Sequence, residues 1–144
     1  MAVQKSHHNA YETHYHLVFP VKYRKALLTN DIPLAIKQIA QEIALRYDID
    51  FEQIGTDGDH IHLLCSFPPK YGGSDVVRIF KSITARELFK QFPALRKELW
   101  GGEFWSDGFY MATVSERADW KTVERYVANQ GKTRSNPSQL RLLI

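Results

Sequence analysis

Apolar and polar positions alternate most regularly between Gly55 and Phe67, in the stretch GTDGDHIHLLCSF. After the turn dipeptide Asp57-Gly58, the residues follow the two-residue period of a half-buried strand. One face of this strand is apolar throughout and consists of Ile61, Leu63, Cys65 and Phe67. The other face carries His60 and His62, which a strand holds about 7 Å apart, close enough to bind one metal ion. The stretch is therefore predicted to be both a core element and a site.

The remaining elements follow from the same kind of pattern. Aromatic and β-branched residues predict three further strands, over residues 13–21, 51–56 and 109–114. Apolar residues that recur every three or four positions predict helices over residues 32–47, 74–91 and 119–130. Strand, helix, strand, strand, helix, strand is the order of the split βαβ arrangement. We therefore expect an α+β, ferredoxin-like (RRM-like) fold: an antiparallel sheet with two helices on one face, an open second face that displays the histidine pair, and a C-terminal helix that carries Tyr126.

The ends of these elements are marked by residues that cap helices or interrupt strands. Asn30 or Asp31 is expected to cap the helix at 32–47, and Ser74 is expected to cap the next one. Pro20 lacks a backbone N–H, so we expect the first strand to end near it.

Length and composition indicate one globular domain. The chain has 144 residues, of which 44% are hydrophobic and 24% are charged, as in ordinary folded proteins. We expect a single domain over residues 1–144, with a flexible N-terminal tail at 1–11 and a C-terminal tail at 133–144. No apolar run is as long as a membrane span and the N-terminus is polar, so we expect a cytoplasmic protein with no membrane partner. Cys65 is the only cysteine, which excludes an internal disulfide and a cysteine-rich metal site.

Two groups of basic residues are candidates for a nucleic-acid surface. The net charge of +3 favours a polyanionic partner only weakly. The first group, Lys22 to Lys25, places three cations around the ring of Tyr23, and is either a solvated loop or a phosphate-binding patch with a stacking ring. The second group lies along one flank of the helix at 74–91 and consists of Arg78, Lys81, Ser82, Arg86 and Lys90. Such a stripe is usually a solvated face. The presence of the first group favours a nucleic-acid-binding role for it.

Two other patterns have an ordinary structural explanation. His14 and His16 repeat the His-x-His spacing in the first strand, where partly buried histidines hydrogen-bonded to their neighbours are the commoner case. Tyr126 and Gln130 are one turn apart on the third helix and therefore share a face. By this spacing alone, Tyr126 is more often a packing aromatic than a nucleophile.

Three motifs in a fixed order carry a resemblance to a known family. GDHIHLL begins at Gly58, LWGGEFWSDGFYMATV follows the basic helix, and VERYVANQ contains Tyr126 and Gln130. Together with HLVFPVKYRKALL near the N-terminus, they resemble the small HUH transposases of bacterial insertion sequences, the TnpA-like group with a single catalytic tyrosine. His14 and His16 are not the histidine pair that matches.

The resemblance implies an activity and a set of site residues. Tyr126 corresponds to the catalytic nucleophile, and the protein ligands of a divalent metal ion (Mg²⁺ or Mn²⁺) correspond to His60, His62 and Gln130. The implied substrate is single-stranded DNA with hairpins at the element ends, which a homodimer cuts and rejoins through a 5′-phosphotyrosine. Whether the active site forms within one subunit or between two is left open. The expected DNA-binding residues come from the two basic groups and are Lys22, Tyr23, Arg24, Lys25, Arg78, Lys81 and Arg86.

The chemistry of the residue types agrees with these roles. A tyrosine hydroxyl, with an ordinary pKa of about 10, needs help to act as a nucleophile at neutral pH. A metal ion held by imidazoles can neutralise and align a phosphate, and imidazole suits Mn²⁺ or Zn²⁺ better than Mg²⁺. Two alternatives remain. One is an inactive or domesticated relative that binds nucleic-acid hairpins without cutting them, and the other is an unrelated zinc hydrolase, which the lack of a glutamate at helical spacing disfavours.

Overall fold

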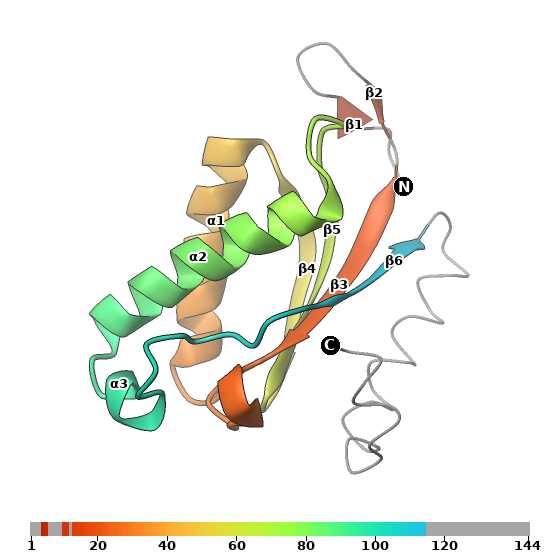
Figure 1. Cartoon of the computed structure of the whole chain (residues 1–144). Helices are drawn as coiled ribbons and strands as arrows, with labels where there is room; N and C mark the ends of the chain where they lie inside the picture. Colours follow the sequence, from red (N-terminus) through yellow and green to blue (C-terminus); the bar gives the residue numbers. More distant parts are fainter. Residues whose placement is uncertain (1–3, 6–9, 12, 115–144) are drawn as a thin grey trace.

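A four-stranded antiparallel sheet forms the centre of the molecule (Figure 1). The computed structural model describes residues 4–5, 10–11 and 13–114. Within them the strand order is β4-β5-β3-β6, and the strands are β3 (His14–Pro20), β4 (Asp50–Asp57), β5 (His60–Ser66) and β6 (Tyr110–Val114). Helix α1 (Ile32–Tyr47) connects β3 to β4, and helix α2 (Gly73–Gln91) connects β5 to β6. This is the predicted split βαβ order, so the expected α+β fold is confirmed.

α1 and α2 lie on the same side of the sheet (Figure 1). Their buried residues recur at helical spacing, as predicted, and are Ala35, Ile36, Ile39, Ala40 and Ile43 on α1 and Val76, Val77, Phe80, Thr84, Leu88 and Phe89 on α2. They share one core with five fully buried residues of β3 and β5, namely Leu17, Phe19, Ile61, Leu63 and Cys65. Removing this apolar surface from water is the main favourable term in folding. Cys65 is therefore the core side chain that its position predicted, and burial raises the pKa of its thiol.

The strands of the sheet and the two long helices begin and end within one residue of the predicted positions. β3 ends at Pro20, as expected. α1 follows Asp31, which makes no capping hydrogen bond with its side chain. The predicted cap of α2 at Ser74 is wrong, because the helix is capped at Gly72, whose N–H donates to the carboxylate of Asp75 at 2.8 Å. The carboxylate of a residue in the first turn thus reaches back to the N–H of the cap residue, which is one half of a capping box.

Four short elements have no counterpart in the sequence prediction. They are β1 (Gln4–Lys5), β2 (Ala10–Tyr11), the 3₁₀ turn η1 (Lys22–Arg24) and α3 (Leu95–Glu98), and β1 pairs antiparallel with β2. Elements of two to four residues are too short to produce a periodic pattern. The predicted helix at 119–130 and the tail at 133–144 lie outside the described residues. Among the residues that are described, no helix is long and apolar enough to cross a membrane.

The second face of the sheet is not open, which corrects the expectation from the sequence. In β3 and β5 it is formed by the even-numbered residues, of which the buried ones are His14, His16, Val18, Pro20, His60, Leu64 and Ser66. His62 is half-buried. Its ring lies over Gly55 and edge-on to the ring of His16, so the imidazoles pack against the sheet and one another instead of projecting into solvent.

Candidate metal and nucleic-acid site

The position of His62 depends on a glycine in the neighbouring strand. Gly55 on β4 is the residue directly opposite His62. A Cβ atom at residue 55 would overlap the His62 imidazole, so the ring occupies the space that a side chain would fill. Glycine inside a strand often marks such a close approach. The register of β4 against β5 therefore determines where this imidazole lies.

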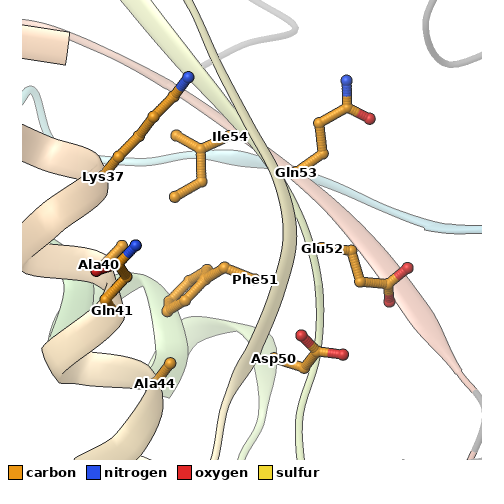
Figure 2. A pocket seen from close by; sticks show the side chains of 9 residues that line it. All are labelled: Lys37, Ala40, Gln41, Ala44, Asp50, Phe51, Glu52, Gln53 and Ile54. Carbon is orange, nitrogen blue, oxygen red and sulfur yellow. The ribbon is translucent and has the colours of Figure 1, made fainter. Parts of the chain in front are cut away.

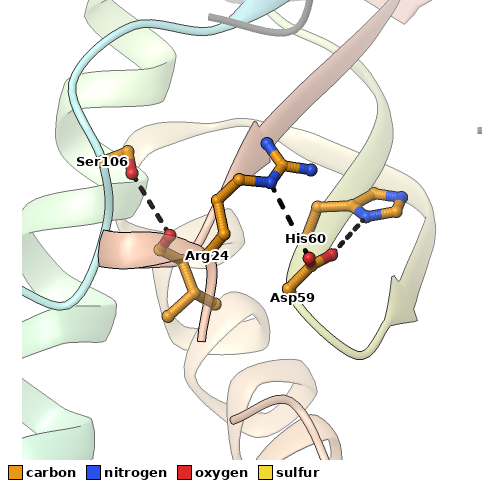
Figure 3. A network of polar contacts seen from close by, with 5 residues as sticks. Arg24, Asp59, His60 and Ser106 are labelled. Atoms are coloured by element: carbon orange, nitrogen blue, oxygen red, sulfur yellow. Dashed lines mark hydrogen bonds and ion pairs between the residues drawn. The ribbon is translucent and has the colours of Figure 1, made fainter. Parts of the chain in front are cut away.

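His60 is oriented by the carboxylate of the preceding residue (Figure 3). Its Nδ1 lies 3.1 Å from Oδ1 of Asp59, whose Oδ2 lies 3.8 Å from Nε of Arg24. The N–H of Val21 donates to the carbonyl of Asp59 at 2.8 Å, which holds the turn before β5 against the chain that follows β3. In metal sites, a carboxylate on one imidazole nitrogen commonly directs the other nitrogen toward the metal. The arrangement at His60 is of this kind.

Three buried nitrogens near this carboxylate fit a metal ion and a phosphate. Nε2 of His60 and both Nη atoms of Arg24 have no hydrogen-bond partner among the described residues. A buried polar atom without a hydrogen-bond partner costs free energy, so we expect each of these nitrogens to bind a ligand. An imidazole lone pair suits a divalent transition-metal ion, and guanidinium N–H groups suit phosphate oxygens. The residues present therefore fit both groups that the resemblance implies.

The first His-x-His pair lies on the same face as the second. The ring of His16 is edge-on to the ring of His62, with 5.7 Å between centroids. His14 is hydrogen-bonded through Nδ1 to the carboxylate of Glu52, as expected for a structural strand histidine. That expectation is wrong for His16, whose two ring nitrogens have no partner in the described part of the chain. The residue opposite His16 on β5 is Leu64, which offers no polar group.

Burial keeps two of these imidazoles neutral. It lowers the pKa of His16 from 6.5 to about 3, with a smaller contribution from the nearby His62. It also lowers the pKa of His62 from 6.5 to about 4, where His60 adds to the effect and the carboxylate of Asp57 opposes it. Metal ions bind the neutral form of imidazole. Both rings therefore have an available lone pair near neutral pH.

The structure brings together two of the predicted metal ligands, His60 and His62. Gln130, the third, and Tyr126, the predicted nucleophile, lie outside the described residues, so their place at the site stays a prediction. Across residues 4–5, 10–11 and 13–114, no three histidine, cysteine or acidic side chains gather in a way that could hold a metal ion.

Each cation of the first basic group has an acidic partner. Arg24 meets Asp59 as described above, Nζ of Lys22 lies 2.8 Å from Glu103, and Nζ of Lys25 lies 3.1 Å from Glu98. The hydrogen bond between Lys22 and Glu103 raises the pKa of the lysine and lowers that of the glutamate. Both glutamates are exposed, and exposed ion pairs are weak, so a phosphate can compete for the lysines.

The residues of the second basic group have different surroundings. Arg78 and Arg86 are exposed on α2, where each pairs with a nearby acid on the same helix. Lys81 is half-buried, and its Nζ donates to the backbone carbonyls of Ser106 at 2.7 Å and Gly108 at 2.8 Å. Lys81 thus connects the segment before β6 to α2, and its ammonium group is already engaged. The two exposed arginines are therefore more accessible to DNA than Lys81. A DNA-binding role for any of the three stays a prediction.

A hollow of about 480 Å³ between α1 and β4 contains none of the predicted site residues (Figure 2). Phe51 and Ile54 point from β4 toward α1, whereas Glu52 and Gln53 point to the opposite side of the strand. Lys37 is the only cation in its lining. With a single cation the hollow does not suit a phosphate backbone, and it contains none of the predicted metal ligands.

Three residues of the site were missed by sequence reasoning. The sequence pattern assigns no site role to Asp59, which holds His60, or to Gly55 and His16. An acid directly before a predicted metal ligand and a glycine inside a predicted strand are signals that could have indicated the first two. No local signal places His16 beside His62, because that contact depends on the pairing of β3 with β5.

Comparison with known proteins identifies the family. The profile of the family described as "Transposase IS200 like" matches residues 9–130, which is most of the chain. The chain belongs to this family. Membership confirms the resemblance found in the sequence and implies DNA strand transfer during transposition of an insertion sequence.

Individual relatives support the assignment of this chain to the IS200-like transposase family. ISDra2 transposase TnpA of Deinococcus radiodurans is 31% identical over 130 residues, which cover 90% of this chain and 92% of the relative. The transposase for insertion sequence element IS200 of Salmonella typhimurium is 27% identical over 123 residues, which cover 85% of this chain and 80% of the relative. The crystal structure of a candidate transposase from Deinococcus radiodurans R1, at 30% identity, superimposes with a TM-score of 0.71 over 88% of this chain and 97% of that one.

Proposed function

We propose that this IS200-like transposase cuts and rejoins single-stranded DNA at the ends of its insertion sequence through a 5′-phosphotyrosine on Tyr126. The proposal depends on the state of His60 in a chain of this family. Its imidazole is buried and is oriented by Asp59, and its Nε2 has no partner among the described residues. The proposed substrate is folded into hairpins. The proposed cofactor is a divalent ion, Mg²⁺ or Mn²⁺, bound by His60, His62 and Gln130.

The side chains around the histidine pair have separate roles in this proposal. His60 and His62 hold the ion through their imidazoles, while Asp59 fixes the ring of His60 and Gly55 leaves room for the ring of His62. Such an ion, when bound, neutralises charge and aligns the scissile phosphate. Arg24 donates its two Nη groups to a phosphate oxygen, which gives both nitrogens an acceptor.

Tyr126 supplies the nucleophile. Its hydroxyl oxygen attacks the phosphorus, loses its proton and forms a phosphotyrosine ester, and the DNA strand leaves with a free 3′-hydroxyl. One phosphodiester is exchanged for another, so little free energy is lost at this step. A later attack by a DNA 3′-hydroxyl can therefore reseal the strand without an energy cofactor.

The first prediction is that Tyr126→Phe abolishes covalent capture of DNA while hairpin binding is unchanged. The variant lacks the attacking oxygen but keeps the ring. The measurement is a denaturing gel of the protein with a labelled single-stranded hairpin from the ends of its own element, with Mg²⁺ or Mn²⁺. Wild type should give a protein-linked label that requires the metal ion, and Tyr47→Phe, a matched change on α1, should give the same label.

The histidine pair is tested in the same assay. His60→Ala should remove the metal-dependent adduct, whereas His14→Ala changes a histidine of the other pair and should retain it. An adduct in Tyr126→Phe would place the nucleophile at another residue. Hairpin binding on a native gel without any covalent species in the wild type would favour the alternative function, a hairpin-binding module that does not cut.

A further inference from the structure

Two exposed aromatic rings lie together at η1, the turn that follows β3 and contacts the residue before β5. Tyr23 of η1 and Trp100, which follows α3, are stacked with 6.0 Å between ring centroids and 18° between ring planes. Tyr23 is 50% exposed and Trp100 is 81% exposed. Large aromatic side chains that gather in solvent are typical of interaction sites.

The backbone beneath both rings is held in place. The N–H of Lys22 donates to the carbonyl of Phe104 at 2.8 Å. Tyr23 has a φ of 59°, in the left-handed region that an aromatic residue seldom adopts, and such conformations concentrate at functional sites. On the other side, Leu99 is 1% exposed and anchors the chain next to Trp100. The backbone that carries both rings is therefore anchored, so a ligand that stacks on them has less of the chain to order.

Cations of the first basic group lie next to the Tyr23 ring, and both lysines have exposed glutamate partners that a phosphate can displace. Nζ of Lys22 lies 5.7 Å from the centroid of the Tyr23 ring, and Lys25 is in the same turn of the chain. Arg24, between them, contacts Asp59 and through it His60 (Figure 3). Exposed aromatic rings bordered by cations are the combination that binds single-stranded nucleic acid, in which bases stack and phosphates meet the charges.

We propose that Tyr23 and Trp100 form a stacking platform for an unpaired base of the DNA substrate, with Lys22 and Lys25 on the adjoining phosphates. The proposal rests on the proposed function for the identity of the substrate. An unpaired base offers the flat face that the rings can stack on, whereas the bases of a duplex cover one another. Because Arg24 belongs to the same turn as Tyr23, the platform positions the DNA next to the residues that orient His60.

Equilibrium binding in the presence of a chelator, which prevents metal-dependent cleavage, tests the platform. The probes are a fluorescein-labelled oligothymidine and an abasic oligomer of the same length and charge. We expect the wild type to bind the thymidine oligomer about tenfold more tightly, as the stacking of a base on an aromatic ring predicts. Trp100→Ala should remove this preference and Trp100→Phe should retain most of it. Leu45→Ala, which removes another exposed apolar side chain, should leave it unchanged.

The outcomes separate the platform from the cleavage reaction. Equal binding of the two oligomers by the wild type, or binding of neither, overturns the platform, and so does a full preference in Trp100→Ala. Circular dichroism confirms that each variant is folded. A protein that prefers the thymidine oligomer but forms no covalent adduct has the platform without the proposed function. A protein that forms the Tyr126 adduct and shows no base preference has the proposed function without the platform.

Discussion

At the scale of single residues, the absence of a side chain at Gly55 determines where the predicted metal ligand His62 lies. The His62 imidazole occupies the position that a Cβ would take. The second prediction is that Gly55→Ala displaces this ring and weakens Mn²⁺ binding about tenfold or more, the range seen when groups that orient a metal ligand are changed. Isothermal titration calorimetry of wild type and variant measures the difference.

Gly73→Ala is the matched control for this substitution. A Cβ at residue 73 would also overlap a side chain, that of Met111, but there the contact is with the sulfur of a flexible and exposed chain that can move aside. We expect Mn²⁺ affinity in Gly73→Ala to equal that of the wild type. Unchanged affinity in a folded Gly55→Ala protein would show that the position of the His62 ring does not matter for metal binding.

At the scale of elements, one threonine connects α2 to the segment before β6. Oγ1 of Thr84 accepts a hydrogen bond from Nε1 of Trp105 at 2.9 Å and donates one to the carbonyl of Phe80 at 2.6 Å. Trp105 is 4% exposed and forms a β-bridge with Val21, at the start of the turn that carries the first basic group. The contact thus supports the candidate nucleic-acid surface as well as the core.

The third prediction is that Thr84→Val lowers the free energy of unfolding by about 1–3 kcal/mol. Valine has nearly the same shape, so the change chiefly leaves the buried indole N–H of Trp105 without an acceptor. Urea denaturation followed by circular dichroism measures the loss. Ser82→Ala, on the exposed side of α2, should change stability by no more than about 0.5 kcal/mol. Equal stability of Thr84→Val and the wild type would mean that the indole finds another acceptor.

At the scale of the whole molecule, the predicted homodimer would allow the site to be shared between two copies of the chain. The described part supplies His60 and His62 but no third histidine, cysteine or acidic ligand. The family resemblance implies a homodimer in which the tyrosine helix of one subunit can meet the histidine pair of the other. We therefore expect a particle of twice the 16.7 kDa chain mass in light scattering.

The fourth prediction follows from such sharing: a mixture of His60→Ala and Tyr126→Phe proteins should regain covalent capture of DNA. Each variant retains the group that the other lacks, so a mixed dimer contains one complete site. The measurement is the denaturing gel described above, after the two proteins have been co-expressed. Each variant alone is the control and should be inactive. A dimeric but inactive mixture would show that each site forms within one subunit.

The sequence by itself determined the strands of the sheet, the two long helices and the family. The two-residue period of 55–67 predicted β5, its apolar face and the shared face of His60 and His62, because these relations involve residues that are close in the chain. The helical spacing of 32–47 and 74–91 predicted the faces that α1 and α2 bury. The motifs around Tyr126 indicated the family before the structure placed any side chain.

Only the tertiary structure decided which distant residues meet. The overlap of His62 with Gly55 depends on the register of β4, and the contact of His16 with His62 depends on the pairing of β3. The stacking of Tyr23 on Trp100 likewise joins segments that have no local pattern in common. The physical reason is that periodicity reports which face of an element is buried, whereas contacts between elements arise from register and packing, which no short stretch of sequence specifies.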